Sequence, residues 1–301
     1  MLYPPMRVLV TGGTGFIGPA LCEVLSIEGH DVTIVSRHPT AVAHGRVIGW
    51  SEVPAAIGAV DAVINLAGEP IAGSRWTAER KRRIHDSRVE ATRALVYAME
   101  QAKQRPRVFI SGSAIGYYGP RDSTPIDETA GPGDDFLASV CRAWEAEAER
   151  AVGLGVRVVR LRTGIVLAPD GGALPEMVRP LRFFAGGVLG DGKQYLSWIH
   201  RIDVVGIILA AMVSDAYQGP VNATALEPAS NAEFMRLLSQ VLARPLVMPG
   251  RLNAWIVRRA FGEMADMLLT GQCVLPGVAI KAGYGFRYPN LVPTLRSIIR
   301  V

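Results

Sequence analysis

Cysteine is scarce in this chain of 301 residues, which contains only Cys22, Cys141 and Cys273. They lie far apart and form no Cys-x-x-Cys pair, so the sequence argues against a disulfide scaffold and a zinc site and suits a reducing compartment. No stretch has the roughly 18 consecutive apolar residues of a membrane span. The first residues also lack the apolar core and cleavage site of a signal peptide. We therefore expect a cytoplasmic protein with no metal site and no membrane anchor.

Acidic residues are outnumbered by basic ones, which gives the chain a formal net charge of +5. The densest basic cluster, residues 80–83, lies on a predicted helix that also carries Glu79 and Asp86. A nucleic-acid surface usually interleaves aromatic side chains with basic ones or belongs to a known motif, and the sequence has neither. The cluster is typical of a solvated helix face, and we expect no nucleic-acid partner.

Strands and helices alternate through the first half of the chain. Nearly continuous apolar segments predict strands, and apolar residues three or four apart predict helices. The expected strands cover 7–11, 31–35, 47–50, 59–66, 107–111 and 156–161, and the expected helices cover 16–28, 77–104 and 134–152. This alternation implies a parallel sheet covered on both faces. The predicted fold class is α/β, a Rossmann-type doubly wound parallel sheet with a smaller C-terminal α/β lobe.

A glycine-rich segment joins the first strand to the first helix. Gly12 permits a tight turn, Gly15 removes a Cβ that would keep the backbone away from a pyrophosphate, and Gly18 lets helix and strand pack closely. Free N–H groups at the start of the helix then face the phosphates. We assign these loop residues to the cofactor: Gly12, Thr14, Gly15, Phe16, Ile17 and Gly18.

The end of the second strand favours NADP(H) over NAD(H). NAD-binding folds usually place an acidic residue there to bind the ribose hydroxyls, but this chain has Ser36, Arg37 and His38 after Val35. The Arg37 guanidinium offers a fork of donors that suits a 2′-phosphate, and Ser36 adds a hydroxyl. The alternative is that Arg37 is an ordinary surface residue after a strand.

The composition changes after about residue 168, where glycines, prolines and short elements replace the regular alternation. We expect a loop at 185–192 and helices at 231–242 and 252–261. Residues 1–168 are predicted to form the NADP(H)-binding domain. Residues 169–301 are predicted to form a smaller lobe on the substrate side, with some elements free to return to the sheet. Since ligands of doubly wound folds bind at the carboxyl ends of the strands, the lobe would close over that crevice.

Four segments resemble known protein sequences. Residues 11–18 are similar to the fingerprint of the extended short-chain dehydrogenase/reductases, in particular the nucleoside-diphosphate-sugar epimerase group, and 65–68, 111–119 and 197–203 resemble further segments of that family. An atypical branch, the epimerase-like YfcH type, is matched most closely, through 65–71, 75–77, 116–119 and the tail 261–272. The resemblance covers essentially the whole chain, and family analogy favours a homodimer.

The resemblance also assigns residues to the site. Ser113 matches the serine that hydrogen-bonds the reacting oxygen. The following residues are expected beside the cofactor: Leu66, Ala67, Gly68, Glu69, Arg88, Ser111 and Gly112. Typical members of the family also carry a Tyr-x-x-x-Lys pair on the helix after the fifth strand, which shuttles a proton and binds the nicotinamide ribose. This chain has no Tyr between Tyr118 and Tyr195 and no Lys between Lys103 and Lys193.

Several groups are candidates to replace that pair. Tyr117 and Tyr118 follow the strand that carries Ser113, and we name them with Ser113 as catalytic candidates; the alternative is that they are ordinary loop aromatics. Cys141 is an acid, a nucleophile or a core residue. Two further residues have open roles, Glu69 as a general base and Arg162 as the partner of a substrate phosphate or of an acid such as Glu128.

His200 and Asp203 form the last candidate pair on the substrate side. They are either an acid/base pair or a structural histidine beside an aspartate that caps a helix.

Two functions follow from the sequence. The first is an NADP(H)-dependent oxidoreductase or epimerase, which passes hydride between the nicotinamide and a small oxygenated substrate such as a nucleotide-linked sugar. The second is an NADPH-binding sensor without turnover, which the missing Tyr/Lys pair favours.

Overall fold

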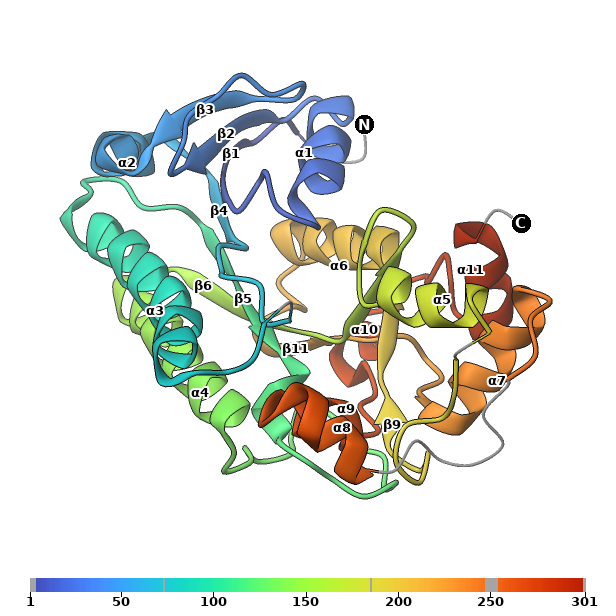
Figure 1. The fold of residues 1–301 in the computed structure, drawn as a ribbon. Coiled ribbons are helices and arrows are strands. Elements are labelled where there is room, and N and C mark those ends of the chain that lie inside the picture. Colours follow the sequence, from blue (N-terminus) through green and yellow to red (C-terminus); the bar gives the residue numbers. More distant parts are fainter. Residues whose placement is uncertain (1–3, 73, 185, 247–253, 300–301) are drawn as a thin grey trace.

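A parallel sheet of seven strands, in the order β11-β6-β5-β4-β1-β2-β3, forms the centre of the computed structural model (Figure 1). The strands are β1 (Arg7–Thr11), β2 (Asp31–Ser36), β3 (Arg46–Gly49), β4 (Ala62–Asn65), β5 (Val108–Ala114), β6 (Arg157–Thr163) and β11 (Gly219–Ala223). Strands β2 and β3 extend the sheet on one side of β1, and the later strands extend it on the other side, beginning with β4. The strand order therefore reverses between β1 and β4, and a doubly wound sheet opens its ligand crevice at such a point. The structure describes residues 4–72, 74–184, 186–246 and 254–299.

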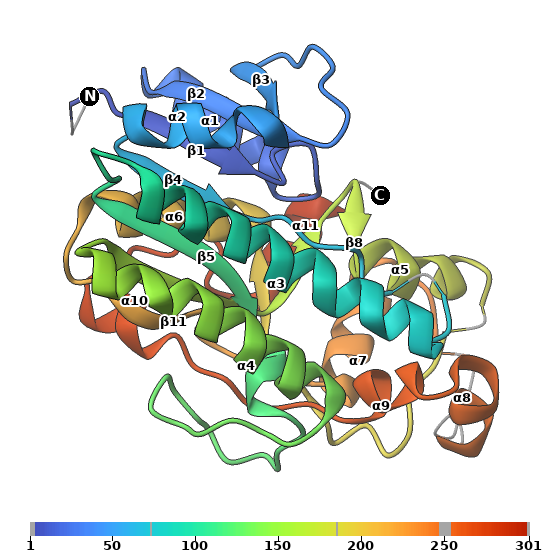
Figure 2. The same cartoon turned by 90° about the vertical axis from the view of Figure 1, so that its left-hand side faces the viewer.

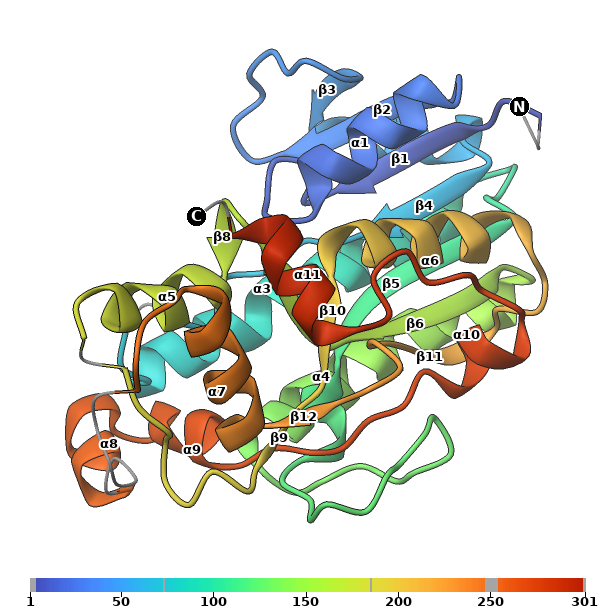
Figure 3. The same cartoon turned by 90° about the vertical axis from the view of Figure 1, so that its right-hand side faces the viewer.

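Helices cover both faces of the sheet. Helices α2 (Val53–Ala56), α3 (Ala78–Gln101) and α4 (Phe136–Glu149) pack on one face (Figure 2), and α1 (Gly18–Ile27) and α6 (Arg201–Val213) pack on the other (Figure 3). The strands are apolar on both sides because both sides are buried: Val8 and Val10 face α1 and α6, whereas Leu9 faces α3. The predicted fold class is confirmed.

The predicted elements differ from the observed ones mainly at their ends. The strand expected at 59–66 is limited to β4, and the strand expected at 107–111 continues to Ala114. Helix α3 has the predicted N-cap, since the Thr77 hydroxyl accepts a hydrogen bond from the Arg80 N–H. Strand β5 therefore carries Ser113 inside the sheet, where its backbone is fixed by pairing with β6.

A smaller lobe packs beside the carboxyl ends of the strands. Its own core joins α5 (Leu174–Arg182), α7 (Asn231–Val241) and α11 (Leu291–Ile298) around the fully buried Trp198. Its short strands are β7 (Ile165–Ala168), β8 (Gly171–Gly172), β9 (Tyr195–Leu196), β10 (Trp198–His200) and β12 (Ala229–Ser230). Two more helices are α8 (Ala254–Phe261) and α9 (Met264–Leu269), whereas α10 (Gly277–Lys281) packs against the core of the large sheet.

The chain beyond residue 168 contributes to both parts. Strand β11 adds to the edge of the large sheet beside β6, and α6 covers that sheet, so 169–301 do not all lie in the smaller lobe. The helix expected at 252–261 corresponds to α8, and its residues 252 and 253 lie outside the described residues, as does residue 185 of the expected loop. Within the described ranges, no helix is both long and apolar enough to cross a membrane.

Candidate functional site

The glycine-rich loop has the geometry of a phosphate cradle. Gly12 has a φ of +70°, and a Cβ there would lie 2.5 Å from the Leu66 carbonyl oxygen. A Cβ on Gly18 would lie 2.3 Å from the Gly12 carbonyl oxygen. Gly15 donates its N–H back to the Gly12 carbonyl at 3.0 Å, which closes the turn before α1 begins. Side chains at Gly12 and Gly18 would collide with the protein's own backbone, so only glycine allows the tight strand-to-helix turn that a dinucleotide-binding loop uses.

Phe16 ties this loop to the smaller lobe. Cβ atoms on Gly171 and Gly172 would lie within 2.9 Å and 2.7 Å of the Phe16 ring. Arg201, which is paired with Asp170, also donates to the Phe16 carbonyl at 3.3 Å. Thr14 and Ile17 lie in the same loop, so the structure brings the six predicted loop residues together.

The residues at the end of β2 lie where the adenosine half of such a dinucleotide is expected. The Ser36 hydroxyl and the His38 backbone bond to each other at 3.1 Å and 3.2 Å, and Arg37 and His38 are exposed. A hollow of about 310 Å³ follows directly, and it is lined by Pro39, Thr40, Ala41, Val42, Gly45 and Val47. The Arg37 guanidinium is therefore at the surface, in reach of solvent and of a phosphate.

Leu66, Ala67 and Gly68 follow β4 at the crevice. The buried Asn65 side chain orders this turn, because its Oδ1 accepts hydrogen bonds from Thr11 Oγ1 at 2.6 Å and from the Ala67 N–H at 3.3 Å. Arg88 of α3 reaches the same turn: a Cβ on Gly68 would lie 3.1 Å from its guanidinium carbon. Ser111 and Gly112 lie on the neighbouring strand β5, so these predicted cofactor residues are close together.

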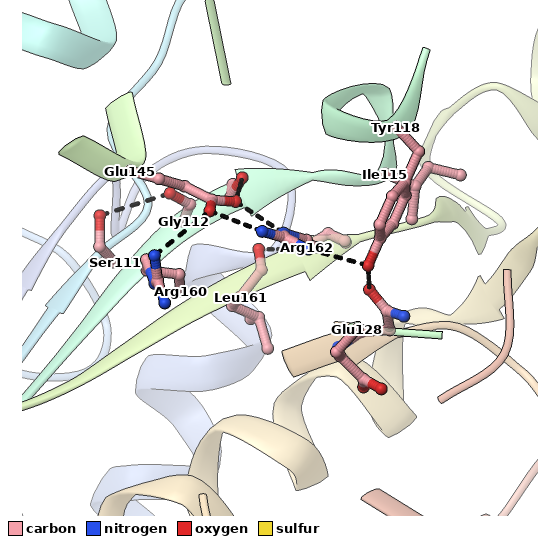
Figure 4. A network of polar contacts seen from close by, with 12 residues as sticks. Ser111, Gly112, Ile115, Tyr118, Glu128, Glu145, Arg160, Leu161 and Arg162 are labelled. Atoms are coloured by element: carbon pink, nitrogen blue, oxygen red, sulfur yellow. Dashed lines mark hydrogen bonds and ion pairs between the residues drawn. The ribbon is translucent and has the colours of Figure 1, made fainter. Parts of the chain in front are cut away.

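Ser113 belongs to a buried polar network, and Figure 4 shows its members Glu145, Arg162 and Tyr118. The Ser113 hydroxyl donates to Glu145 Oε1 at 2.7 Å. Arg162 of β6 holds the same carboxylate with two hydrogen bonds, Nε to Oε1 at 2.8 Å and Nη2 to Oε2 at 2.9 Å. The partner of Arg162 is thus Glu145 and not Glu128. Burial opposes the charge on Arg162, but the Glu145 carboxylate outweighs burial and raises the pKa of the guanidinium.

Cys141 lies one helical turn before Glu145 on α4. Burial, assisted by the Glu145 charge, raises the pKa of the Cys141 thiol to about 12, and Ser113 is a hydrogen-bonding neighbour of that thiol. Residues four apart share one face of a helix. Cys141 and Glu145 therefore have the spacing of a Tyr-x-x-x-Lys pair, and both reach Ser113. Glu145 was not among the site residues predicted from the sequence, although this spacing was a signal for it.

Tyr118 is fully buried, which does not fit a hydroxyl presented to a substrate. Its Oη donates to Asn222 Oδ1 at 2.7 Å and accepts from Arg162 Nη1 at 3.0 Å. Burial raises the pKa of this phenol to about 12. Tyr117 is partly exposed, and the Arg162 guanidinium carbon lies 3.5 Å from the centre of its ring. Of the two tyrosines, Tyr117 is the one whose position remains open to a ligand.

Glu128 has a structural task in this arrangement. Its Oε1 accepts hydrogen bonds from the Asn222 N–H at 2.9 Å and from the Val278 N–H at 3.1 Å. Asn222 in turn donates its side-chain amide to the Leu275 carbonyl at 2.9 Å. The network that starts at Ser113 thus reaches the segment before α10.

His200 and Asp203 hold the C-terminal segment rather than forming a pair. His200, not Asp203, caps α6, because its Nδ1 accepts from the Ile202 N–H at 3.1 Å, and its ring stacks on Tyr288 at 3.8 Å. The fully buried Asp203 carboxylate accepts from the N–H groups of Arg287 and Tyr288 at 2.8 Å and 2.9 Å. Burial lowers the pKa of His200 to about 4. These contacts favour the structural alternative.

Glu69 is not a free carboxylate, because Arg80 of α3 forms an ion pair with it and also donates to the Pro70 carbonyl. Arg80 is buried, which corrects the expectation of a solvated basic face; Arg82 and Arg83 are exposed as expected, and Lys81 pairs with Glu263. Within the described part of the chain, no group of three or more His, Cys, Asp or Glu side chains could hold a metal ion.

Comparison with known proteins identifies the family. The model of the NAD dependent epimerase/dehydratase family matches residues 8–223, and a model for a domain of unknown function, DUF1731, matches 253–298. The chain belongs to the NAD dependent epimerase/dehydratase family. Its nucleotide loop and sheet order agree with the atypical extended short-chain dehydrogenase/reductase type that the sequence indicated.

Relatives extend over the whole chain. The human epimerase family protein SDR39U1 is 39% identical over 98% of this chain and 100% of its own length. The epimerase family protein YfhF of Bacillus subtilis is 36% identical over 98% of each. A chloroplastic SDR39U1 homolog of Arabidopsis thaliana is 39% identical over 98% of this chain and 87% of its own length.

Solved structures agree with this placement. A crystal structure of human SDR39U1 with NADPH superposes with a TM-score of 0.90 at 38% identity, over 97% of this chain and 99% of the other. A nucleoside-diphosphate sugar epimerase from Corynebacterium glutamicum gives a TM-score of 0.79 at 31% identity, over 98% of this chain and 58% of the other. The cofactor predicted from Arg37 is thus the one that the human structure contains.

Proposed function

We propose that the protein is an NADP(H)-dependent oxidoreductase or epimerase that acts on a small oxygenated substrate, with nucleotide-linked sugars as the first class to test. The family supports the epimerase or dehydratase type of chemistry, and the NADPH in the human relative supports the cofactor. When bound, NADP(H) supplies a hydride donor or acceptor. No nucleic-acid partner is proposed; a homodimer and a cytoplasmic location remain predictions.

Ser113 carries this proposal. It lies at the carboxyl end of β5, beside the point where the sheet order reverses, and ligands of such sheets bind there. The Glu145 carboxylate accepts a hydrogen bond from the Ser113 hydroxyl, so the lone pairs of the serine oxygen are left to accept a hydrogen bond from a ligand. A substrate hydroxyl is the kind of group that provides such a donor. Tyr117, above the Arg162 guanidinium, is the neighbouring group with which a substrate would share this space.

The second candidate function is an NADPH-binding sensor without turnover. It is favoured by the properties of the ionisable side chains around Ser113. The thiol of Cys141 has a pKa of about 12, so it stays protonated at neutral pH. Glu145 is engaged by both Arg162 and Ser113. A general acid or base works best with a pKa near the operating pH, and neither Cys141 nor the deeply buried Tyr118 meets that requirement.

Turnover distinguishes the two functions. We would follow NADPH absorbance with the purified protein against carbonyl compounds and sugar nucleotides, and NADP⁺ reduction against the corresponding alcohols. The variants Ser113→Ala and Tyr117→Phe accompany the unaltered protein. We expect turnover with one substrate class and a loss of roughly 100-fold or more in kcat/KM for Ser113→Ala. Tight NADPH binding without turnover on any compound would favour the sensor.

A further inference from the structure

Trp144 of α4 is a buried side chain whose polar atom has no partner in the described part of the chain. The residue is 7% exposed, and its indole Nε1 neither touches solvent nor finds an acceptor among the residues described. An indole N–H can only donate. Leaving such a donor unpaired in the interior costs free energy, so the unpaired Trp144 N–H needs an explanation.

The position of the ring indicates an acceptor at the crevice. A Cβ on Gly112 would lie 2.8 Å from Cζ2 of the Trp144 ring and 2.9 Å from Cη2. Cζ2 is bonded to the ring carbon that carries Nε1, so the N–H belongs to the edge of the indole that lies against β5. Gly112 is close to the carboxyl end of that strand, and its lack of a side chain lets the indole approach the strand directly.

Arg88 lies over the ring of the indole. Its guanidinium carbon is 5.3 Å from the centre of the Trp144 ring and 3.1 Å from where a Cβ on Gly68 would be. Burial lowers the pKa of Arg88, and its Nη1 donates to the Ile84 carbonyl at 2.9 Å. Two donor groups therefore lie together against the backbone that ends β4 and β5.

We propose that the Trp144 Nε1–H, with the Arg88 guanidinium beside it, hydrogen-bonds the ribose on the nicotinamide side of NADP(H). A dinucleotide whose pyrophosphate lies at the start of α1 and whose 2′-phosphate lies at Arg37 extends its other half over β4 and β5. The hydroxyls of that ribose are acceptors that match two neighbouring donors, and α4 carries no lysine to fill this role. The inference rests on the proposed cofactor but not on turnover.

Binding of two nucleotides tests the inference without any substrate. NADPH contains the nicotinamide-side ribose, whereas adenosine 2′,5′-bisphosphate contains only the adenosine half with its 2′-phosphate. Trp144→Phe keeps a buried aromatic ring and removes the N–H. By isothermal titration calorimetry we expect this variant to bind NADPH about three- to tenfold more weakly and to bind the bisphosphate unchanged. Arg88→Gln is expected to show the same selectivity.

Trp198→Phe is the matched control. Trp198 is also buried, but its Nε1 donates within the protein, to the Glu227 carbonyl at 3.0 Å. We expect this variant to lose thermal stability and keep its NADPH affinity. Unchanged NADPH binding by Trp144→Phe, or an equal loss for both nucleotides, would overturn the inference alone. If the unaltered protein binds neither nucleotide, the proposed function fails and the inference fails with it.

Discussion

Arg162 and Glu145 form a two-pronged ion pair between β6 and α4, in which both side chains are at least 96% buried. The oxygen that accepts from Arg162 Nε also accepts from the Ser113 hydroxyl, at 2.7 Å. The pair therefore fixes the rotation of the serine and leaves its lone pairs pointing away from the carboxylate. Because a charge without its partner is costly at such depth, this arrangement also affects the stability of the whole sheet.

The Glu145→Gln variant tests that dependence. Removing the carboxylate charge leaves the Arg162 guanidinium buried without compensation, and we expect the free energy of unfolding to fall by about 3–5 kcal/mol. Urea denaturation followed by circular dichroism measures the difference. Glu147→Gln is the control on the same helix, because its partners Arg93 and Arg150 are both exposed, and it should cost no more than about 1 kcal/mol. Equal losses in the two variants would contradict a special role for the buried pair.

The Arg37→Glu variant tests the choice of cofactor. A carboxylate at this exposed position would repel a 2′-phosphate, and hydrogen bonds between charged groups contribute about 1.5–3 kcal/mol each. We expect the dissociation constant for NADPH to rise by roughly 10- to 100-fold, while that for NADH stays within about threefold. Arg46→Glu makes the same charge change at the exposed start of β3. If the two variants lose NADPH affinity to the same extent, Arg37 affects NADPH binding only through the net charge of the protein.

Local sequence rules predicted the sheet and the nucleotide loop because the interactions there are local. The loop that ends at Gly18 depends on neighbours in the sequence, and the apolar strands depend on burial of both faces. The loop residues and the residues after β4 consequently lie together as expected. The early residues of α3 were less predictable, because Arg80 turns inward to meet Glu69 across a turn that sequence patterns do not specify.

The residues around Ser113 depend on contacts between distant segments. The partner of Arg162 follows from the register of β5 against β6 and from the rotation of α4, so Glu128 was as good a candidate as Glu145 in the sequence. Likewise, Tyr118 reaches Asn222, which is 104 residues away. His200 and not Asp203 caps α6, because the Asp203 carboxylate binds the distant N–H groups of Arg287 and Tyr288.

The three cysteines are predicted to be unreactive in the folded protein. All are buried, and burial raises the pKa of Cys22 to about 11, that of Cys141 to about 12, and that of Cys273 above its ordinary value. Because the thiolate is the reactive form, we expect no labelling by iodoacetamide at pH 8 in native buffer and complete labelling in urea. Intact-protein mass spectrometry counts the added groups. Rapid addition of a group in native buffer, assigned to Cys141 by peptide mapping, would show a reactive thiol beside Ser113.

Stability should depend on pH through His200. Burial lowers its pKa to about 4, with Asp203 opposing this effect and Arg201 and Arg287 adding to it. An unfolded histidine has a pKa of about 6.5, so between pH 4 and 6.5 the unfolded chain binds more protons than the folded one. The stabilisation is therefore present above about pH 6.5 and is lost as the pH falls toward 4, by about 2–3 kcal/mol.

The His200→Asn variant isolates this contribution, because asparagine can still cap α6 but does not titrate. Urea unfolding of both proteins at several pH values between 7 and 4 gives the difference in stability at each pH, and groups common to both proteins cancel. We expect the variant to be the less stable protein at pH 7, since it loses the stacking on Tyr288, and the gap to narrow steadily toward pH 4. A gap that stays constant over this range would mean that the histidine in the folded protein has an ordinary pKa, and that its burial against Tyr288 is offset by the nearby Asp203 carboxylate.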